Sequence, residues 1–156
     1  MIALGVVELL KHPAQLELFK ADPDKWTAPF VEELCRYHTA SALATKRVAK
    51  VDIVLGGKTI KAGEGIIAAT QSGNRDEDVF PDPDTFDMQR KRGTEEALGY
   101  GWGEHRCVAE WLARAELEIA FGKLERARVV IFKDEANVSS YALEESPDAE
   151  TCSSVG

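Results

Sequence analysis

The chain has 156 residues, of which 44% are hydrophobic and 29% charged, as is ordinary for a globular domain that buries a core. Its formal net charge of −8 excludes a general nucleic-acid partner, because no surplus of lysine and arginine is present to neutralise phosphates. The charge is uneven, since residues 133–156 hold six acidic residues against Lys133 alone.

Cysteine usage and the amino-terminal segment bear on location. Cys35, Cys107 and Cys152 lie far apart and do not form the pattern of a secreted disulfide framework, so we expect a reducing, cytoplasmic compartment. The apolar start MIALGVVELL has no preceding basic residue and is shorter than the ~20 residues that span a bilayer. We therefore expect neither a signal peptide nor a membrane anchor.

The first forty residues predict helices. Apolar residues at helical spacing predict a helix over residues 1–10, and a second short helix is expected over 13–19. The Asp-Pro pair at 22–23 is expected to end it. The run PFVEELCRY predicts a third helix over 29–37, with its proline in the first turn.

The middle of the chain predicts short strands and one long loop. Two strand-like runs within residues 51–64 meet at Gly56-Gly57, which is the signal of a hairpin, and residues 66–69 predict a further short strand. Residues 72–97 lack periodicity over a length that is usually functional or disordered.

The last third predicts one long helix. Apolar residues recur at i, i+3, i+4, i+7 and i+11 from Val108, so we expect a helix that runs to about Leu124. Residues 128–132 could form a strand, and the acidic segment beyond has no periodicity and is expected to be disordered. The fold class predicted is mainly α with small β-sheets.

The stretch YGWGEHRC, residues 100–107, is the strongest candidate site. A cysteine at the start of a helix is favoured as thiolate by the helix dipole, and glycines before it allow a sharp turn that aims backbone N–H groups at the sulfur. A single soft thiolate offered from a rigid loop is a ligand typical of haem iron.

Three other interpretations of this stretch compete. Structural zinc requires three or four close cysteine and histidine ligands, and only His105 and Cys107 are neighbours here. A dinucleotide loop requires G-x-G-x-x-G after a strand, whereas this sequence has G-x-G-x-G after an irregular stretch. A plain buried cysteine in a glycine-rich turn remains open from this stretch alone.

A second candidate lies on the helix over 29–37. Glu33 and Arg36 stand at positions i and i+3, so their side chains can meet on one face of a largely apolar helix. A buried pair must be satisfied by further partners, and another arginine would serve.

Taken together, EELCR (32–36), FPDPDTFDMQR (80–90) and YGWGEHRCVA (100–109) resemble the three sequence marks of the cytochrome P450 family, in the family's order. The resemblance implies that the chain is the C-terminal, haem-binding part of that fold. In the family, the residues that match Glu33, Arg36 and Arg90 form a buried ion triad with a structural role.

The same resemblance assigns the cofactor residues. It implies that Cys107 is the thiolate ligand of the iron of haem b. His105 and Arg47, the latter in the strand segment TKRVAK, would bind haem propionates; without the resemblance Arg47 could equally be a surface arginine. Tyr100, Gly101 and Ala109 complete the cofactor-binding loop by the same comparison.

Within the family, Ala109 in place of the commoner glycine, together with the runs NRDEDVFPDPDTFD and CRYHTASALATKRVAK, resembles the fungal nitric oxide reductases. Those enzymes take a hydride directly from NADH and reduce nitric oxide to nitrous oxide, so NADH is a further expected cofactor. The alternative is a monooxygenase that hydroxylates a small organic substrate, which alone would need a separate redox partner.

The resemblance covers residues 1–124 and leaves 125–156 as an unmatched acidic tail. By comparison with the family, the chain begins where the long central helix is ending, so the distal wall of the haem pocket and its catalytic residues are expected to be absent. No catalytic residue is assigned for this reason. A non-catalytic, truncated product is the competing hypothesis from a different class.

Overall fold

The computed structural model describes residues 1–44, 46–91, 97–126, 129–131 and 141–143. Helices dominate and the strands are short, as the sequence predicts. In chain order the elements are α1 (Ile2–Lys11), α2 (Pro13–Ala21), α3 (Pro23–His38), β1 (Arg47–Val48), β2 (Ile53–Leu55), β3 (Lys58–Ile60), β4 (Gly65–Ile66), α4 (Thr70–Gly73), the 3-10 turns η1 (Leu98–Tyr100) and η2 (Gly103–His105), α5 (Glu110–Arg126), β5 (Val129–Ile131) and β6 (Tyr141–Leu143).

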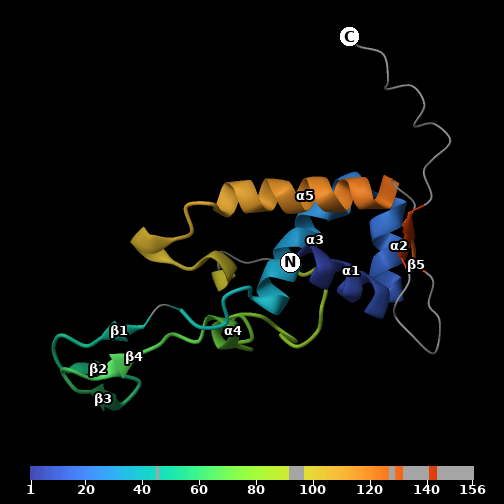
Figure 1. Cartoon of the computed structure of the whole chain (residues 1–156). Helices are drawn as coiled ribbons and strands as arrows, with labels where there is room; N and C mark the ends of the chain where they lie inside the picture. The colour runs from blue at the N-terminus through green and yellow to red at the C-terminus, as the bar shows by residue number, and fades with distance from the viewer. Residues whose placement is uncertain (45, 92–96, 127–128, 132–140, 144–156) are drawn as a thin grey trace, which may run out of the picture.

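The hydrophobic core lies where α3 packs against α1, α2 and α5 (Figure 1). Its centre is the ring of Phe30, which is fully buried and meets the ring of Phe121 on α5 edge-on at a centroid distance of 4.8 Å. Phe19 of α2 and Phe86 of the long loop approach the same ring at 5.4 and 5.8 Å. Edge-to-face ring pairs of this kind add to the apolar burial.

The helix α3 begins at Pro23, six residues before the predicted start at Pro29. The Asp-Pro pair does not simply end α2, because Asp22 also caps α3: its carboxylate accepts a hydrogen bond from the Lys25 backbone N–H at 3.1 Å. Pro23 occupies the first helical position, where its missing N–H is not needed. Pro29 consequently lies inside the helix rather than in its first turn.

Strands β1 to β4 form two small antiparallel sheets away from the helical body (Figure 1). The predicted hairpin is confirmed: β2 pairs with β3, and Gly56 and Gly57 at the turn have φ angles of +55° and +72°. Such positive angles at both turn residues match the twist of the strands and favour glycine. Of the strand predicted over 66–69, only Ile66 belongs to β4, which pairs with β1.

The carboxyl-terminal region contains one further hairpin. The strand expected within 128–132 is present as β5, and it pairs antiparallel with β6, a pairing that the sequence did not suggest. Most of the remaining residues of the segment 125–156 lie outside the described residues, so the division after Leu124 and the expected disorder beyond it stay predictions.

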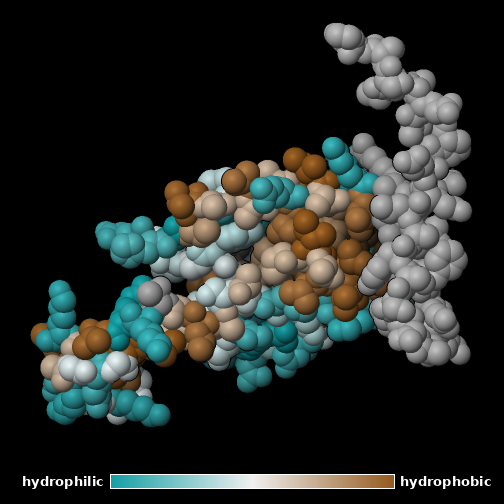
Figure 2. Space-filling view, viewed as in Figure 1, coloured by the Kyte–Doolittle hydropathy of each residue, from teal (hydrophilic) through white to brown (hydrophobic). Residues whose placement is uncertain are grey.

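One face of the helical body exposes large apolar side chains. Figure 2 shows an apolar patch over the helices, and exposed apolar residues occur on α1, on α5 and beside Cys107. They are Ile2, Leu4, Val7, Leu10, Val108, Trp111, Leu112 and Ile119. Within the described residues, no helix is long and apolar enough to cross a membrane.

The contact between α1 and α5 depends on a glycine. A Cβ atom built on Gly5 would lie 2.9 Å from Cδ2 of Leu34 and closer still to the ring of Phe121. Real Cβ atoms do not approach other heavy atoms so closely, and both neighbours belong to the buried core. The helices can therefore meet at this distance only because residue 5 has no side chain.

We expect Gly5→Ala to lower the free energy of unfolding by about 1–3 kcal/mol, because the added methyl group overpacks the core. Gly122→Ala on α5 is the matched control, since a Cβ there meets nothing within 4 Å. The control should be neutral or stabilising by up to about 1 kcal/mol through helix propensity. Urea unfolding of both variants measures the difference, and equal effects would contradict this account of the interface.

Candidate functional site

The long loop is attached to α3 through a buried ion pair. Arg36 donates from Nε and Nη2 to the two carboxylate oxygens of Glu33 at 2.8 and 2.7 Å, so the contact is bidentate. The two residues are only 2% and 3% exposed. Because an unpaired buried charge is costly, each end of this pair needs further partners.

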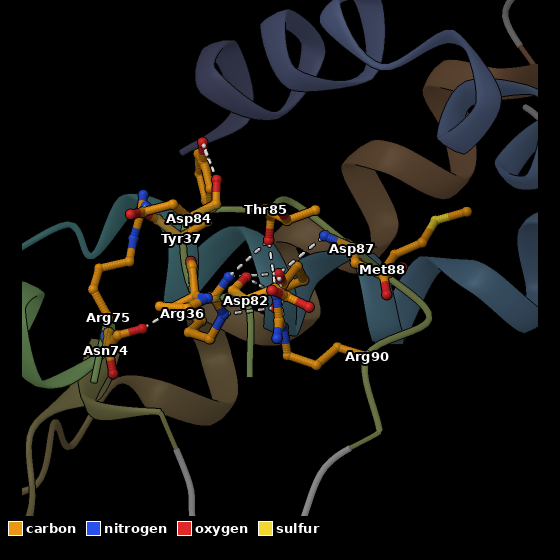
Figure 3. A network of polar contacts seen from close by, with 12 residues as sticks. Arg36, Tyr37, Asn74, Arg75, Asp82, Asp84, Thr85, Asp87, Met88 and Arg90 are labelled. Atoms are coloured by element: carbon orange, nitrogen blue, oxygen red, sulfur yellow. Dashed lines mark hydrogen bonds and ion pairs between the residues drawn. The ribbon is translucent and has the colours of Figure 1, made fainter. Parts of the chain in front are cut away.

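Those partners come from the loop residues that follow α4 (Figure 3). Arg90 donates from Nε to Glu33 at 3.2 Å, and the backbone N–H of Asp87 donates to the same carboxylate at 3.1 Å. The structure thus brings Glu33, Arg36 and Arg90 together as one cluster. The carboxylate receives two guanidinium groups and a backbone donor in a nearly dry environment.

Backbone carbonyl oxygens satisfy the remaining N–H groups of the two arginines. Arg36 donates from Nη1 to the carbonyl oxygens of Asn74 and Pro83 at 2.8 and 2.9 Å. Arg36 and Arg90 both donate from Nη2 to the carbonyl oxygen of Thr85, at 3.2 and 2.8 Å. These bonds hold an irregular segment against α3 without helix or strand.

A buried asparagine links this cluster to the cysteine loop. Asn74 is fully buried, and its side-chain amide donates to the hydroxyl of Thr39 at the end of α3 at 2.8 Å. Its side-chain oxygen accepts from the backbone N–H of Leu98, the first residue of η1, at 2.6 Å. Asn74 therefore fixes the start of the loop that carries Cys107.

The cysteine loop is a sequence of tight turns. Gly101 and Gly103 have φ angles of +78° and +79°, and a Cβ on either would meet nothing within 4 Å. The backbone N–H of Cys107 donates to the carbonyl oxygen of Tyr100 at 2.9 Å, and the Arg106 N–H donates to Gly103. Cys107 itself is exposed and precedes α5, which begins at Glu110.

The side chain of Tyr100 connects the loop to α3. Its hydroxyl lies 3.4 Å from the sulfur of Cys35, and the guanidinium of Arg114 lies 4.9 Å from its ring centroid. Burial, followed by the contact with Cys35, raises the pKa of the Tyr100 hydroxyl, so this group stays neutral. The ring is an anchor for the loop.

The other predicted cofactor residues are solvent-exposed. His105 lies in η2 and Ala109 lies just before α5, so both share one loop with Tyr100, Gly101 and Cys107. Arg47 lies on a different element, in β1 of the small sheet. Among the described residues, no group of three or more histidine, cysteine, aspartate or glutamate side chains could hold a metal ion.

The residues present fit a haem group. The sulfur of Cys107 is accessible, and no side chain projects from Gly101 or Gly103 to block an approach to the loop. Exposed apolar side chains adjoin the loop: Trp102 is 68% exposed and Val108 is 100% exposed. A flat apolar macrocycle with a thiolate-binding iron matches this combination of a free sulfur, an open face and apolar neighbours.

Comparison with known proteins identifies the family. A family model described as cytochrome P450 matches residues 25–135. The chain belongs to the cytochrome P450 family, and the family named from the sequence motifs is confirmed. In this family the haem iron is bound by a cysteine thiolate.

Individual relatives agree. Cytochrome P450 55A3 of Fusarium lichenicola is 64% identical over 124 residues, which are 80% of this chain and 30% of the relative. Pentalenic acid synthase of Streptomyces avermitilis is 44% identical over 124 residues, again 80% and 30%. The structure of cytochrome P450 CYP109Q5 from Chondromyces apiculatus is similar with a TM-score of 0.73 and 34% identity, over 80% of this chain and 31% of that one. The chain thus spans about 30% of the length of its relatives.

Sequence reasoning missed two residues that organise the site. Glu110 is 4% exposed and binds Arg106 and Arg114, and the hydrogen bond from Arg106 lowers the pKa of its carboxyl group. The spacing of four residues on each side of Glu110 was a usable signal. Asn74 had no comparable signal, because a single asparagine in a loop is common.

We expect Glu33→Gln to lower the free energy of unfolding by about 3–5 kcal/mol, because it leaves Arg36 and Arg90 without the buried charge that compensates them. Glu17→Gln is the control, since Glu17 pairs with Lys20 on the exposed face of α2 and should cost at most about 0.5 kcal/mol. Chemical denaturation measures both. Similar losses in the two variants would contradict a stabilising role for the triad.

Proposed function

We propose that this chain forms the proximal side of a haem-thiolate oxidoreductase, with Cys107 as the ligand of the iron. One observation carries the proposal: an accessible sulfur projects from a loop whose backbone is fixed by Tyr100, directly before a long helix. Such a backbone restraint keeps the direction of the sulfur constant.

Cys107, His105 and Arg47 have proposed roles in holding the cofactor. When bound, the haem supplies the redox chemistry, and the thiolate of Cys107 donates electron density to its iron. Cys107 lies three residues before α5 begins, so the turn that precedes the helix presents its sulfur. His105 and Arg47 are exposed cationic or hydrogen-bonding groups that suit the two propionates.

For the whole protein, we propose reduction of nitric oxide to nitrous oxide with NADH as the direct donor. The support is the motif likeness to the fungal nitric oxide reductases and the 64% identity with a fungal cytochrome P450. The second candidate is a monooxygenase for a small organic substrate, which the 44% identity with pentalenic acid synthase favours.

A chimera tests the role of Cys107 in a complete pocket. Residues 1–124 of this chain, the part that carries the family resemblance, replace the matching segment of the Fusarium lichenicola relative, which is 64% identical over 124 residues. The reduced chimera with carbon monoxide should give the red-shifted Soret band of a thiolate-bound haem. Cys107→Ser should abolish this band, while Cys35→Ser, on a buried cysteine of α3, should retain it.

The same chimera separates the two candidate activities. Consumption of NADH driven by nitric oxide supports the reductase, whereas product formation that needs oxygen and an added reductase supports the monooxygenase. A thiolate band that persists in Cys107→Ser would overturn the assignment of the ligand.

The 156-residue chain alone should bind hemin weakly and show no turnover. The surface beside Cys107 is open, with Trp102 68% and Val108 100% exposed, so we expect one side of a haem bound there to stay in water. At ~25 cal/mol per Å2 of apolar surface, an uncovered face forfeits much of the binding free energy. Hemin titration, reduction and addition of carbon monoxide check this, and a stable thiolate-type band would contradict it.

A further inference from the structure

The carboxylate of Glu110 is the meeting point of two arginines beside the cysteine loop. Glu110 is the first residue of α5 and is nearly fully buried. Arg106 donates to it from Nε and Nη2, the latter at 2.6 Å. Arg114 donates from Nε and Nη2 at 3.1 and 2.8 Å. These are charge-assisted bonds whose carboxylate end is buried, and such bonds are stronger than neutral hydrogen bonds.

Both arginines are connected to the backbone of Cys107, one through the chain and the other through Tyr100. Arg106 directly precedes Cys107 in the chain. Arg114 lies over the ring of Tyr100, and the carbonyl oxygen of Tyr100 accepts the hydrogen bond from the Cys107 N–H at 2.9 Å. The backbone N–H of Glu110 also donates to the carbonyl oxygen of Cys107 at 3.2 Å. The peptide groups on both sides of the cysteine are therefore tied to Glu110 or to its partners.

The same cluster reaches α3. Arg114 forms an ion pair with Glu32, which lies on α3 next to Glu33 of the buried triad. The cysteine loop is thus attached to the body of the molecule by a chain of charges that runs from Glu32 through Arg114 and Glu110 to Arg106.

We propose that Glu110 is a positioning residue that fixes the backbone of Cys107 through Arg106 and Arg114. The importance of that cysteine rests on the proposed function, but the restraint on its backbone does not. Glu110 does not touch the reacting atoms. It determines where the sulfur is held relative to α3 and α5.

Amide hydrogen exchange in the 156-residue chain tests the restraint without any cofactor. In Glu110→Gln we expect exchange at Cys107 to become about tenfold faster, since the loss of one charge from this cluster weakens bonds of the charge-assisted class. Exchange at Leu34 in the core reports global unfolding and should change far less. Glu116→Gln, an exposed position on the same helix, is the matched control and should leave Cys107 unchanged.

Unchanged exchange at Cys107 in Glu110→Gln, or an equal rise at Cys107 and Leu34, would overturn the proposal. If Glu110→Gln does not fold, Arg106→Gln decides the question in the same way, because Arg106 is partly exposed and its loss leaves the pair of Glu110 and Arg114 in place. Faster exchange at Cys107 alone is the expected result, and no change overturns the role.

The chimera distinguishes this inference from the proposed function. In the chimera, Glu110→Gln should convert part of the thiolate-type carbonyl band to the blue-shifted band of a haem that has lost thiolate ligation. Arg106→Lys should retain more of the thiolate band than Arg106→Gln. An unchanged band in Glu110→Gln and in Arg106→Gln would contradict the positioning role of Glu110. If the unmutated chimera lacks the thiolate band, the proposed function fails, while the exchange measurement still decides the role of Glu110.

Discussion

The buried carboxylate of Glu33 is the interaction on which the rest of the structure depends. Two guanidinium groups and one backbone N–H donate hydrogen bonds to it. Arg36 donates its remaining hydrogen bonds to backbone carbonyl oxygens of Asn74 and of the loop after α4. A buried charge network of this kind is stable only when every member is paired. If the loop after α4 left α3, Glu33 and Arg36 would lose the loop partners that compensate their buried charges. Its path is therefore fixed although it forms no sheet.

The position of Cys107 follows from that fixed loop. The backbone carbonyl oxygen of Asn74 accepts a hydrogen bond from Arg36, and its side chain bonds to Thr39 and Leu98. Asn74 therefore connects the triad to the start of η1. From η1 the chain reaches Cys107 through turns that only glycine adopts readily, and the Cys107 N–H returns to Tyr100. A structural ion cluster thereby determines the place of the cysteine that we propose as the iron ligand, because a short, hydrogen-bonded segment connects them.

The sequence predicts the parts of this arrangement that are local. The pairing of Glu33 with Arg36 follows from helical spacing, and the hairpin follows from two adjacent glycines. Arg90 is 57 residues from Glu33, so its place came from the family resemblance rather than from any spacing. The start of α3 was predicted wrongly because an Asp-Pro pair is a helix breaker when it follows a helix and a cap when it precedes one. Asn74 could not be predicted, since its partners meet only in the folded chain.

Near the site the charged side chains are paired, whereas many apolar side chains on α1 and α5 are not buried. The charges near the site find partners within it: Glu33 binds Arg36 and Arg90, and Glu110 binds Arg106 and Arg114. The apolar side chains on α1 and α5 remain exposed instead. Hydrogen-bonded charge clusters impose geometry, so the geometry around Cys107 can exist before a cofactor arrives. Apolar burial, in contrast, supplies most of the binding free energy. Affinity for that cofactor then depends on whatever covers the exposed apolar faces, which is why loop geometry and haem binding are separable properties of this chain.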